Sequence, residues 1–310
     1  HFTRLALQVG LPVTSLVKQT IYSHFCGGES LEETIPTIDR LARSGVSTIL
    51  DYGGEAKEEE EEFDRAMQEQ LRAIEFADGN PNVPYLSCKF TGYASFELLE
   101  KLHSESELND EDVAALHRLK TRLEKICDCA VASDAAVYID AEESWIQGGI
   151  DRLTEALMAR YNREKPVVFN TVQLYRHDRL EFLKESHRRA EDGDYILGVK
   201  LVRGAYMEKE RERAERVGSV DPIHVDKASV DADFDAALIY CLEHIERIAF
   251  CAATHNEDSC MLLVRTAIDR GIDLHHPHIH FAQLFGMSDH ISFNLAKAGF
   301  NASKYVPYGP

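Results

Sequence analysis

The sequence has few basic residues relative to acidic ones and no long apolar run. Its 34 Lys and Arg face 53 Asp and Glu, which gives a formal net charge of -19. Because binding to a nucleic-acid backbone normally requires a basic face, this balance argues against a nucleic acid as partner. No apolar stretch approaches the ~18 residues of a membrane span, and no signal peptide opens the chain. We expect an acidic enzyme that does not cross a membrane.

Several motifs of nucleotide and ester chemistry are also missing. The chain has no G-x-G-x-x-G after a strand pattern, no G-x-x-x-x-G-K-[ST] and no G-x-S-x-G. These absences exclude Rossmann, P-loop and α/β-hydrolase interpretations. The seven cysteines are odd in number and scattered, which favours reduced thiols and an intracellular compartment. The histidine-rich segment 275–280 straddles the start of a predicted strand, and His278 and His280, which would share a face, have no carboxylate close in sequence, so we expect no metal site there.

What the chain does contain is an alternation of strand and helix patterns. Amphipathic stretches such as 144–161 and 228–245 predict helices between segments rich in Val, Ile, Phe or Tyr. Alternating elements imply a parallel sheet, and eight strands imply a closed (βα)8 barrel of the TIM type. The predicted strands are 46–54, 85–91, 136–142, 166–173, 196–203, 248–256, 278–284 and 304–308.

The predicted domain organisation is an N-terminal helical arm at 1–44 and a barrel catalytic domain at 45–310. Leu16, Val17 and Ile21 form one face of the arm. The acidic stretch 103–113 is expected to be a solvated insertion. The sequence stops directly after the eighth strand, so the barrel's last helix is expected to be missing from it.

In such barrels the active site lies at the carboxyl ends of the strands, where this chain is unusually polar. Lys200 and Arg203 with Gly204 suit an anionic or electron-rich ligand. Lys89 and Asp140 allow two interpretations: a structural ion pair, or a site in which Lys89 holds a carboxylate while Asp140 tunes the protonation of a substrate amine. The other polar residues that close strands are Asp51, Glu142, Asn170, Gln173, Thr254, His255, Asn256, Gln283 and Tyr305.

Six motifs follow one another along the chain: Y-I-D-A-E-E at 138–143, F-N-T-V-Q-L-Y at 169–175, K-L-V-R-G-A-Y at 200–206, A-T-H-N at 253–256, Q-L-F-G-M at 283–287 and K-Y-V-P-Y-G-P at 304–310. Together they resemble the proline dehydrogenase family, which implies a distorted form of the barrel. F-C-G-G-E at 25–29 and K-L-V-R-G resemble its eukaryote-like branch most. The resemblance implies a noncovalently bound FAD and oxidation of L-proline to Δ1-pyrroline-5-carboxylate, the first step of proline catabolism. The hydride would pass to flavin N5 and the electrons to a membrane quinone, with possible peripheral membrane association.

The resemblance also assigns site residues. Lys89, Asp140, Leu201 and Tyr305 would line the proline pocket, and Glu55 is the candidate for an acidic gate. Lys200 would be the cation beside flavin N5, and Arg203 would serve the flavin phosphates or pair with Glu208. The implied FAD contacts are Gln173, Lys200, Val202, Arg203, Gly204, Ala205, Tyr206, Thr254, His255, Asn256 and Gln283.

The family's paired-arginine motif for the substrate carboxylate does not occur in this sequence, which leaves Lys89 as the evident carboxylate partner. Two alternatives therefore stay open. One is an aldolase-type barrel in which Lys200 or Lys89 forms a Schiff base. The other is a barrel that binds flavin but is inactive without the final helix. The compartment is bacterial cytoplasm or inner membrane, or the mitochondrion in a eukaryote; proline against hydroxyproline and the oligomeric state stay undecided.

Overall fold

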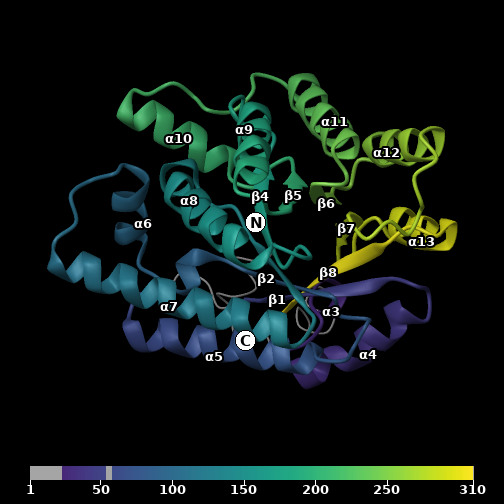
Figure 1. Ribbon diagram of the computed structural model, residues 1–310, viewed down its shortest axis with the longest axis horizontal. Coiled ribbons are helices and arrows are strands. Elements are labelled where there is room, and N and C mark those ends of the chain that lie inside the picture. Colours follow the sequence, from purple (N-terminus) through teal and green to yellow (C-terminus); the bar gives the residue numbers. More distant parts are fainter. Residues whose placement is uncertain (1–22, 54–57, 310) are drawn as a thin grey trace, which may run out of the picture.

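A computed structural model describes residues 23–53 and 58–309. In it, eight parallel strands close into a barrel in chain order, with β1 paired to both β2 and β8. Figure 1 shows the helices arranged around these strands. The predicted (βα)8 architecture and all eight predicted strands are confirmed. The strands are β1 Ser47–Tyr52, β2 Tyr85–Cys88, β3 Ala136–Ile139, β4 Val168–Gln173, β5 Leu197–Val202, β6 Ile248–Ala253, β7 Ile279–Leu284 and β8 Ala302–Tyr308.

The helices between the strands present one apolar side to the barrel. Predicted helix 144–161 is found as α8, and 228–245 is found as α11 with ends shifted by one or two residues. The described helices are α3 Ser23–Phe25, α4 Leu31–Ala42, α5 Glu60–Ala77, α6 Phe96–His103, α7 Asp110–Ala132, α8 Ser144–Tyr161, α9 Arg179–Asp192, α10 Met207–Val217, α11 Lys227–Glu243, α12 Glu257–Asp269 and α13 Asp289–Ala298, with a short 3-10 turn, η2, at Phe90–Gly92.

The prediction of a solvated insertion at 103–113 holds only for 104–109, a mostly exposed loop between α6 and α7. Asp110 and Asp112 belong to the first turn of α7, and Asn109 and Asp112 form a capping box with reciprocal bonds of 2.9 and 3.1 Å. Carboxylates stabilise the positive end of a helix dipole, so an acidic run marks a helix start as readily as a solvated loop.

The helical arm is described only in part. Leu16, Val17 and Ile21 lie outside the described residues. Helix α4 begins at the N-cap Ser30, and just before it the Gly27 amide donates to the Pro307 carbonyl of β8 at 2.8 Å. The division between an arm at 1–44 and a barrel at 45–310 stays a prediction.

Toward the amino ends of the strands, side chains fill the barrel interior. The rings of Tyr85 and Tyr138 stack with centroids 4.7 Å apart, and the rings of Tyr138 and Phe169 form a T-shaped pair with centroids 5.1 Å apart. His280 packs against Tyr85 and shares a 2.6 Å hydrogen bond with Ser303, and burial lowers the pKa of His280 to about 3. This histidine is therefore a neutral packing residue at neutral pH. Within residues 23–53 and 58–309, no group of His, Cys, Asp or Glu is arranged to hold a metal ion.

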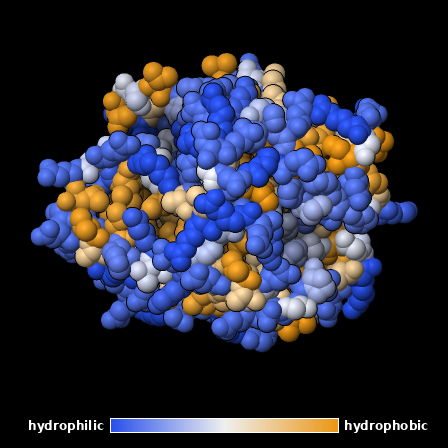
Figure 2. All heavy atoms as spheres, viewed as in Figure 1, coloured by the Kyte–Doolittle hydropathy of each residue, from blue (hydrophilic) through white to orange (hydrophobic). Residues whose placement is uncertain are grey.

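The outer surface agrees with the acidic composition. Figure 2 shows a largely hydrophilic face on which hydrophobic side chains appear as separate patches. Across the part of the chain that the structure describes, each helix is too short or too polar to traverse a bilayer.

Candidate active site

A cavity of about 680 Å³ opens at the carboxyl ends of the strands. All eight strands, or the residues directly after them, contribute to its wall, as expected for this fold. It contains fourteen of the fifteen residues predicted to contact proline or FAD, Leu201 being the exception. The lining residues are Asp51, Lys89, Asp140, Ala141, Thr171, Gln173, Lys200, Val202, Arg203, Gly204, Ala205, Tyr206, Lys227, Ala253, Thr254, His255, Asn256, Ala282, Gln283, Leu284 and Tyr305.

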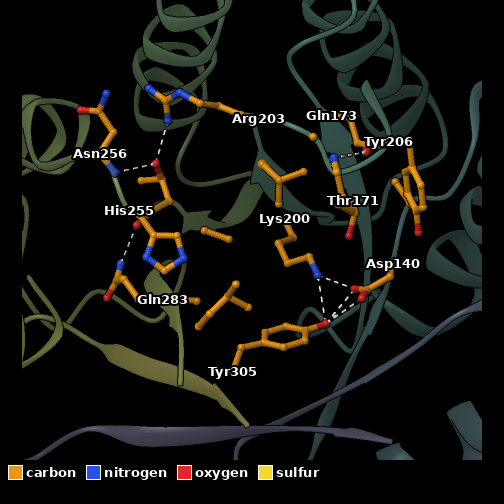
Figure 3. Close-up of a pocket in the computed structure, with 18 of the residues that line it drawn as sticks. Asp140, Thr171, Gln173, Lys200, Arg203, Tyr206, His255, Asn256, Gln283 and Tyr305 are labelled. Carbon is orange, nitrogen blue, oxygen red and sulfur yellow. Dashed lines mark hydrogen bonds and ion pairs between the residues drawn. The ribbon is translucent and has the colours of Figure 1, made fainter. Parts of the chain in front are cut away.

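Three side chains from distant strands meet on one wall of the cavity. The ammonium of Lys200 forms an ion pair with Asp140 and donates to the Tyr305 hydroxyl at 3.1 Å. The Tyr305 hydroxyl lies 2.8 and 2.9 Å from the two oxygens of Asp140. In Figure 3 the three point toward one another. The Lys200 side chain is only 5% exposed, so the cavity carries a fixed, buried cation.

A second part of the wall contains Asp51 and Lys89, and Glu142 is buried near Lys89 without lining the cavity. Asp51 ends β1 and accepts a 2.6 Å hydrogen bond from Ser87. Burial and then the charge of Asp140 raise the pKa of Asp51 to about 6. Burial also raises the pKa of Glu142 to about 7, against two hydrogen bonds from Thr91 at 2.6 and 3.1 Å.

Of the two interpretations of Lys89 and Asp140, the structural ion pair is not found among the described residues. Lys89 lies in the cavity wall, but Asp140 is paired with Lys200. Lys89 instead acts electrostatically on Asp51 and Glu142, where its charge lowers both pKa values. The sequence could not show which cation pairs with Asp140, because Lys89, Lys200 and Arg203 all stand at or near the carboxyl ends of strands.

The loop after β5 approaches the cavity with its backbone. The Ala205 amide donates to Gln173 Oε1 at 3.2 Å, and Gln173 Nε2 donates to the Glu142 carbonyl at 2.9 Å. Gly204 has a φ of +145°, and a Cβ added there would lie 2.5 Å from the ring of Tyr175. Only glycine fits this conformation and this space, which brings the chain from Val202 to Tyr206 along the cavity wall.

Arg203 is held by Thr254, which directly follows β6, and by residues of α11 and α12. Its guanidinium donates to Asp231 at 2.8 Å, Thr254 at 2.7 Å and Ser259 at 3.0 Å, and it lies 4.3 Å above the ring of Phe234. The alternative pairing with Glu208 is thereby corrected, since among the described residues Arg203 forms its ion pair with Asp231. The fixed cation lines the cavity beside Lys227.

The residues that close β6 and β7 are positioned by hydrogen bonds. Asn256 is the N-cap of α12 and accepts from the Ser259 amide at 3.1 Å. His255 Nδ1 is 2.9 Å from the Ser288 hydroxyl, and burial lowers its pKa. Gln283 donates to the Thr254 carbonyl at 3.1 Å and accepts from the hydroxyl of Ser292. All four predicted contacts, Thr254 included, line the cavity.

Leu201 does not reach the cavity, so the predicted contact with substrate is corrected. Its side chain is fully buried in the layer between strands and helices. Successive side chains of a strand point to opposite faces, so the inward Lys200 and Val202 place Leu201 outward. Glu55, the predicted gate, lies outside the described residues.

Three polar wall residues were not assigned a ligand role from the sequence. Asp51 was noticed only as a strand end, Thr171 sits inside a buried strand, and Lys227 opens a helix. The Thr171 hydroxyl is buried and has no hydrogen-bond partner among the described residues. Thr171 and Gln173 are two residues apart on β4, so their side chains point to the same face of the strand. This spacing would have identified Thr171 as a residue of the cavity wall.

Comparison with known proteins points to one family. The family model described as proline dehydrogenase matches residues 34–310. The carbapenem antibiotics biosynthesis protein CarD of Pectobacterium carotovorum is 35% identical and is aligned over 94% of this chain and 75% of its own length. The mitochondrial proline dehydrogenases 1 of Dictyostelium discoideum and Arabidopsis thaliana are 30% and 32% identical, over 100% and 96% of this chain and 62% and 68% of their own lengths.

Among solved structures, proline utilization A from Bdellovibrio bacteriovorus, inactivated by N-propargylglycine, superposes with a TM-score of 0.85 at 22% identity. The match covers 97% of this chain and 32% of that protein, and at this identity it supports the fold alone. The sequence relatives support more than the fold, because they are at least 30% identical over nearly the whole chain. Together with the family model they show that the chain belongs to the proline dehydrogenase family.

Proposed function

We propose that this chain oxidises L-proline to Δ1-pyrroline-5-carboxylate with FAD as cofactor and a membrane quinone as electron acceptor. The observation that carries the proposal is the charge pattern of the cavity, where two carboxylates, Asp51 and Asp140, face two lysines, Lys89 and Lys200. A cavity with both signs of charge suits a zwitterionic amino acid. Lys89 would bind the substrate carboxylate, and Tyr305 and Asp140 would form the floor against the ring.

The cavity residues also fit a flavin nucleotide. The unpartnered hydroxyl of Thr171 and the cations of Arg203 and Lys227 offer a hydrogen bond and charge to a polar, anionic cofactor. When bound, FAD supplies a two-electron acceptor. Lys200 provides positive charge at this wall, which stabilises an anion that develops there. The further proposed contacts are Gln173, Val202, Gly204, Ala205, Tyr206, Thr254, His255, Asn256 and Gln283.

The contacts of Lys200 argue against the aldolase-type alternative. A Schiff-base lysine needs a neutral amine with room for attack. Lys200 is instead engaged by an ion pair with Asp140 and a hydrogen bond to Tyr305. Borohydride in the presence of a carbonyl substrate should leave the mass of the chain unchanged.

A titration tests the main proposal. The purified chain should acquire flavin absorbance on addition of FAD, and L-proline with an artificial electron acceptor should give an imine product that o-aminobenzaldehyde traps. Hydroxyproline run in parallel decides between the two substrates. Protein that binds no FAD would contradict the whole proposal. FAD binding without turnover would instead support an inactive flavin-binding barrel.

A second prediction concerns the cofactor contact alone. Thr171→Val keeps the shape of the side chain and removes a hydroxyl that has no hydrogen-bond partner among the described residues, so thermal stability without FAD should not fall. If the hydroxyl bonds FAD, the Kd should rise by about 5- to 10-fold, which corresponds to ~1 kcal/mol. Fluorescence titration measures the Kd. An unchanged Kd would remove Thr171 from the cofactor site.

The electron acceptor and the location of the chain belong to the same proposal. A quinone is a membrane-dissolved acceptor, so peripheral association with a membrane would accompany this function. The compartment would be the mitochondrion in a eukaryote, or the cytoplasmic face of the inner membrane in a bacterium. Proline-dependent reduction of a quinone in liposomes tests both points.

A further inference from the structure

The two carboxylates in the cavity wall differ in how far their oxygens are engaged. Both oxygens of Asp140 accept hydrogen bonds, from Lys200 and Tyr305. Asp51 accepts through Oδ1 from Ser87 at 2.6 Å. Within residues 23–53 and 58–309, Oδ2 of Asp51 takes part in no hydrogen bond or ion pair. Asp51 therefore offers an open acceptor at the cavity wall.

The barrel register directs Asp51 into the cavity. Ile49, two residues earlier on β1, belongs to the barrel interior and is paired with Tyr305 of β8. Side chains two apart on a strand share a face, so Asp51 lies one layer above Ile49, toward the cavity opening. Its neighbour across the β1–β2 pair is Ser87, which fixes the carboxylate.

A secondary ammonium brings two N–H donors into this cavity, and each needs an acceptor. The hydrogen bonds from Lys200 and Tyr305 already engage Asp140, and they leave Asp51 as the acceptor with an open oxygen. We propose that Asp51 binds the substrate's secondary ammonium and takes up one of its protons. This role rests on the proposed function and extends it to a residue that the sequence had not assigned.

The proton step is balanced within the site. The N–H bond breaks, its electron pair stays on nitrogen, and the proton forms an O–H bond on the Asp51 carboxylate. Nothing is oxidised or reduced in this step. The neutral nitrogen then has a lone pair that can form the C=N bond once the adjacent ring carbon loses its hydride, and the proton of Asp51 returns to solvent.

The electrostatic surroundings make Asp51 a better proton acceptor than an ordinary aspartate. Burial, followed by Asp140, raises its pKa to about 6, while the hydrogen bond from Ser87 and the charges of Lys89 and Lys200 lower it. The other ionisable groups that interact with it are Tyr305 on β8 and Tyr93 and Cys88 near β2. A base with a pKa nearer to that of its partner transfers protons more readily.

The direction of the pH effect follows from that raised pKa. Below pH about 6, Asp51 is protonated in the empty cavity and cannot accept a proton. The kcat/KM for proline should therefore fall as the pH drops through this region. Asp51→Asn should lack this acidic limb, because its amide does not titrate.

Binding by two ring compounds tests the role without turnover. The flavin-loaded chain and Asp51→Asn are titrated by calorimetry with L-proline and with tetrahydrofuran-2-carboxylate, in which a ring oxygen replaces the N–H group. Asp51→Asn should weaken proline binding by about tenfold or more, since a charged hydrogen bond is lost, and should leave the oxygen compound nearly unaffected. Equal effects on both ligands, or on neither, would overturn the inference.

Ser87→Ala provides a second variant should Asp51→Asn not fold. It removes the 2.6 Å hydrogen bond that lowers the pKa of Asp51 and keeps the carboxylate, so the acidic limb should move to higher pH. A limb at the wild-type position would contradict the role of Asp51. Wild-type protein that binds neither ring compound would contradict the proposed function itself, which separates the two failures.

Discussion

Lys200→Ala should lower kcat/KM for proline oxidation by roughly 10²–10³-fold, the loss typical of removing one preorganised group that stabilises developing charge. Lys200 is the buried cation of the cavity, and the variant also leaves Asp140 without its ionic partner. Steady-state assays with an artificial acceptor, normalised to bound flavin, measure the effect. A variant that keeps wild-type kcat/KM would show that this cation takes no part in the reaction.

A second buried lysine gives a matched control. Lys304 on β8 is fully buried, donates to the Met287 carbonyl and pairs with Asp289 at 2.8 Å. Its side chain does not line the cavity. Lys304→Met should lower thermal stability while the folded, flavin-loaded protein keeps its kcat. Equal losses of kcat in Lys200→Ala and Lys304→Met would point to general damage to the barrel rather than to a missing cation at the site.

Gly204→Ala should destabilise the chain and weaken cofactor binding together. The left-handed φ of +145° is strained for any residue with a Cβ, which costs about 1–3 kcal/mol. The new methyl group would also meet the Tyr175 ring at 2.5 Å, and such overpacking typically costs a further ~1–3 kcal/mol. Relief requires a shift of the backbone that lines the cavity. Denaturant unfolding and FAD titration measure the two effects.

Gly218→Ala is a control that separates the cost of a left-handed backbone from the effect of a position in the cavity wall. Gly218 ends α10 with a φ of +69°, and a Cβ there would meet nothing within 4 Å. This variant should cost only about 1–2 kcal/mol for the left-handed conformation and should leave FAD affinity unchanged. If Gly204→Ala behaved in the same way, the close approach of Tyr175 would have no bearing on the cofactor site.

Much of the fold could be predicted from local patterns. Each strand shows as a short run of β-branched and aromatic residues, and the cavity residues are the polar ones that end these runs. Where prediction failed, local pattern was ambiguous. The acidic residues near Asp110 fit a loop and a helix start equally well, and Leu201 appeared beside Lys200 in a motif although the strand turns the two side chains to opposite faces.

The sequence by itself determined the order of strands and helices, the polarity of the strand ends and the family. Only the tertiary structure decided which charges meet. Asp140 is 60 residues from Lys200 and 165 from Tyr305 along the chain, and their contact depends on barrel closure and register. The same closure leaves an oxygen of Asp51 open to the cavity and confines Lys304 to the outer layer. Local patterns encode where a side chain stands on its strand, whereas its partners depend on how all eight strands pair.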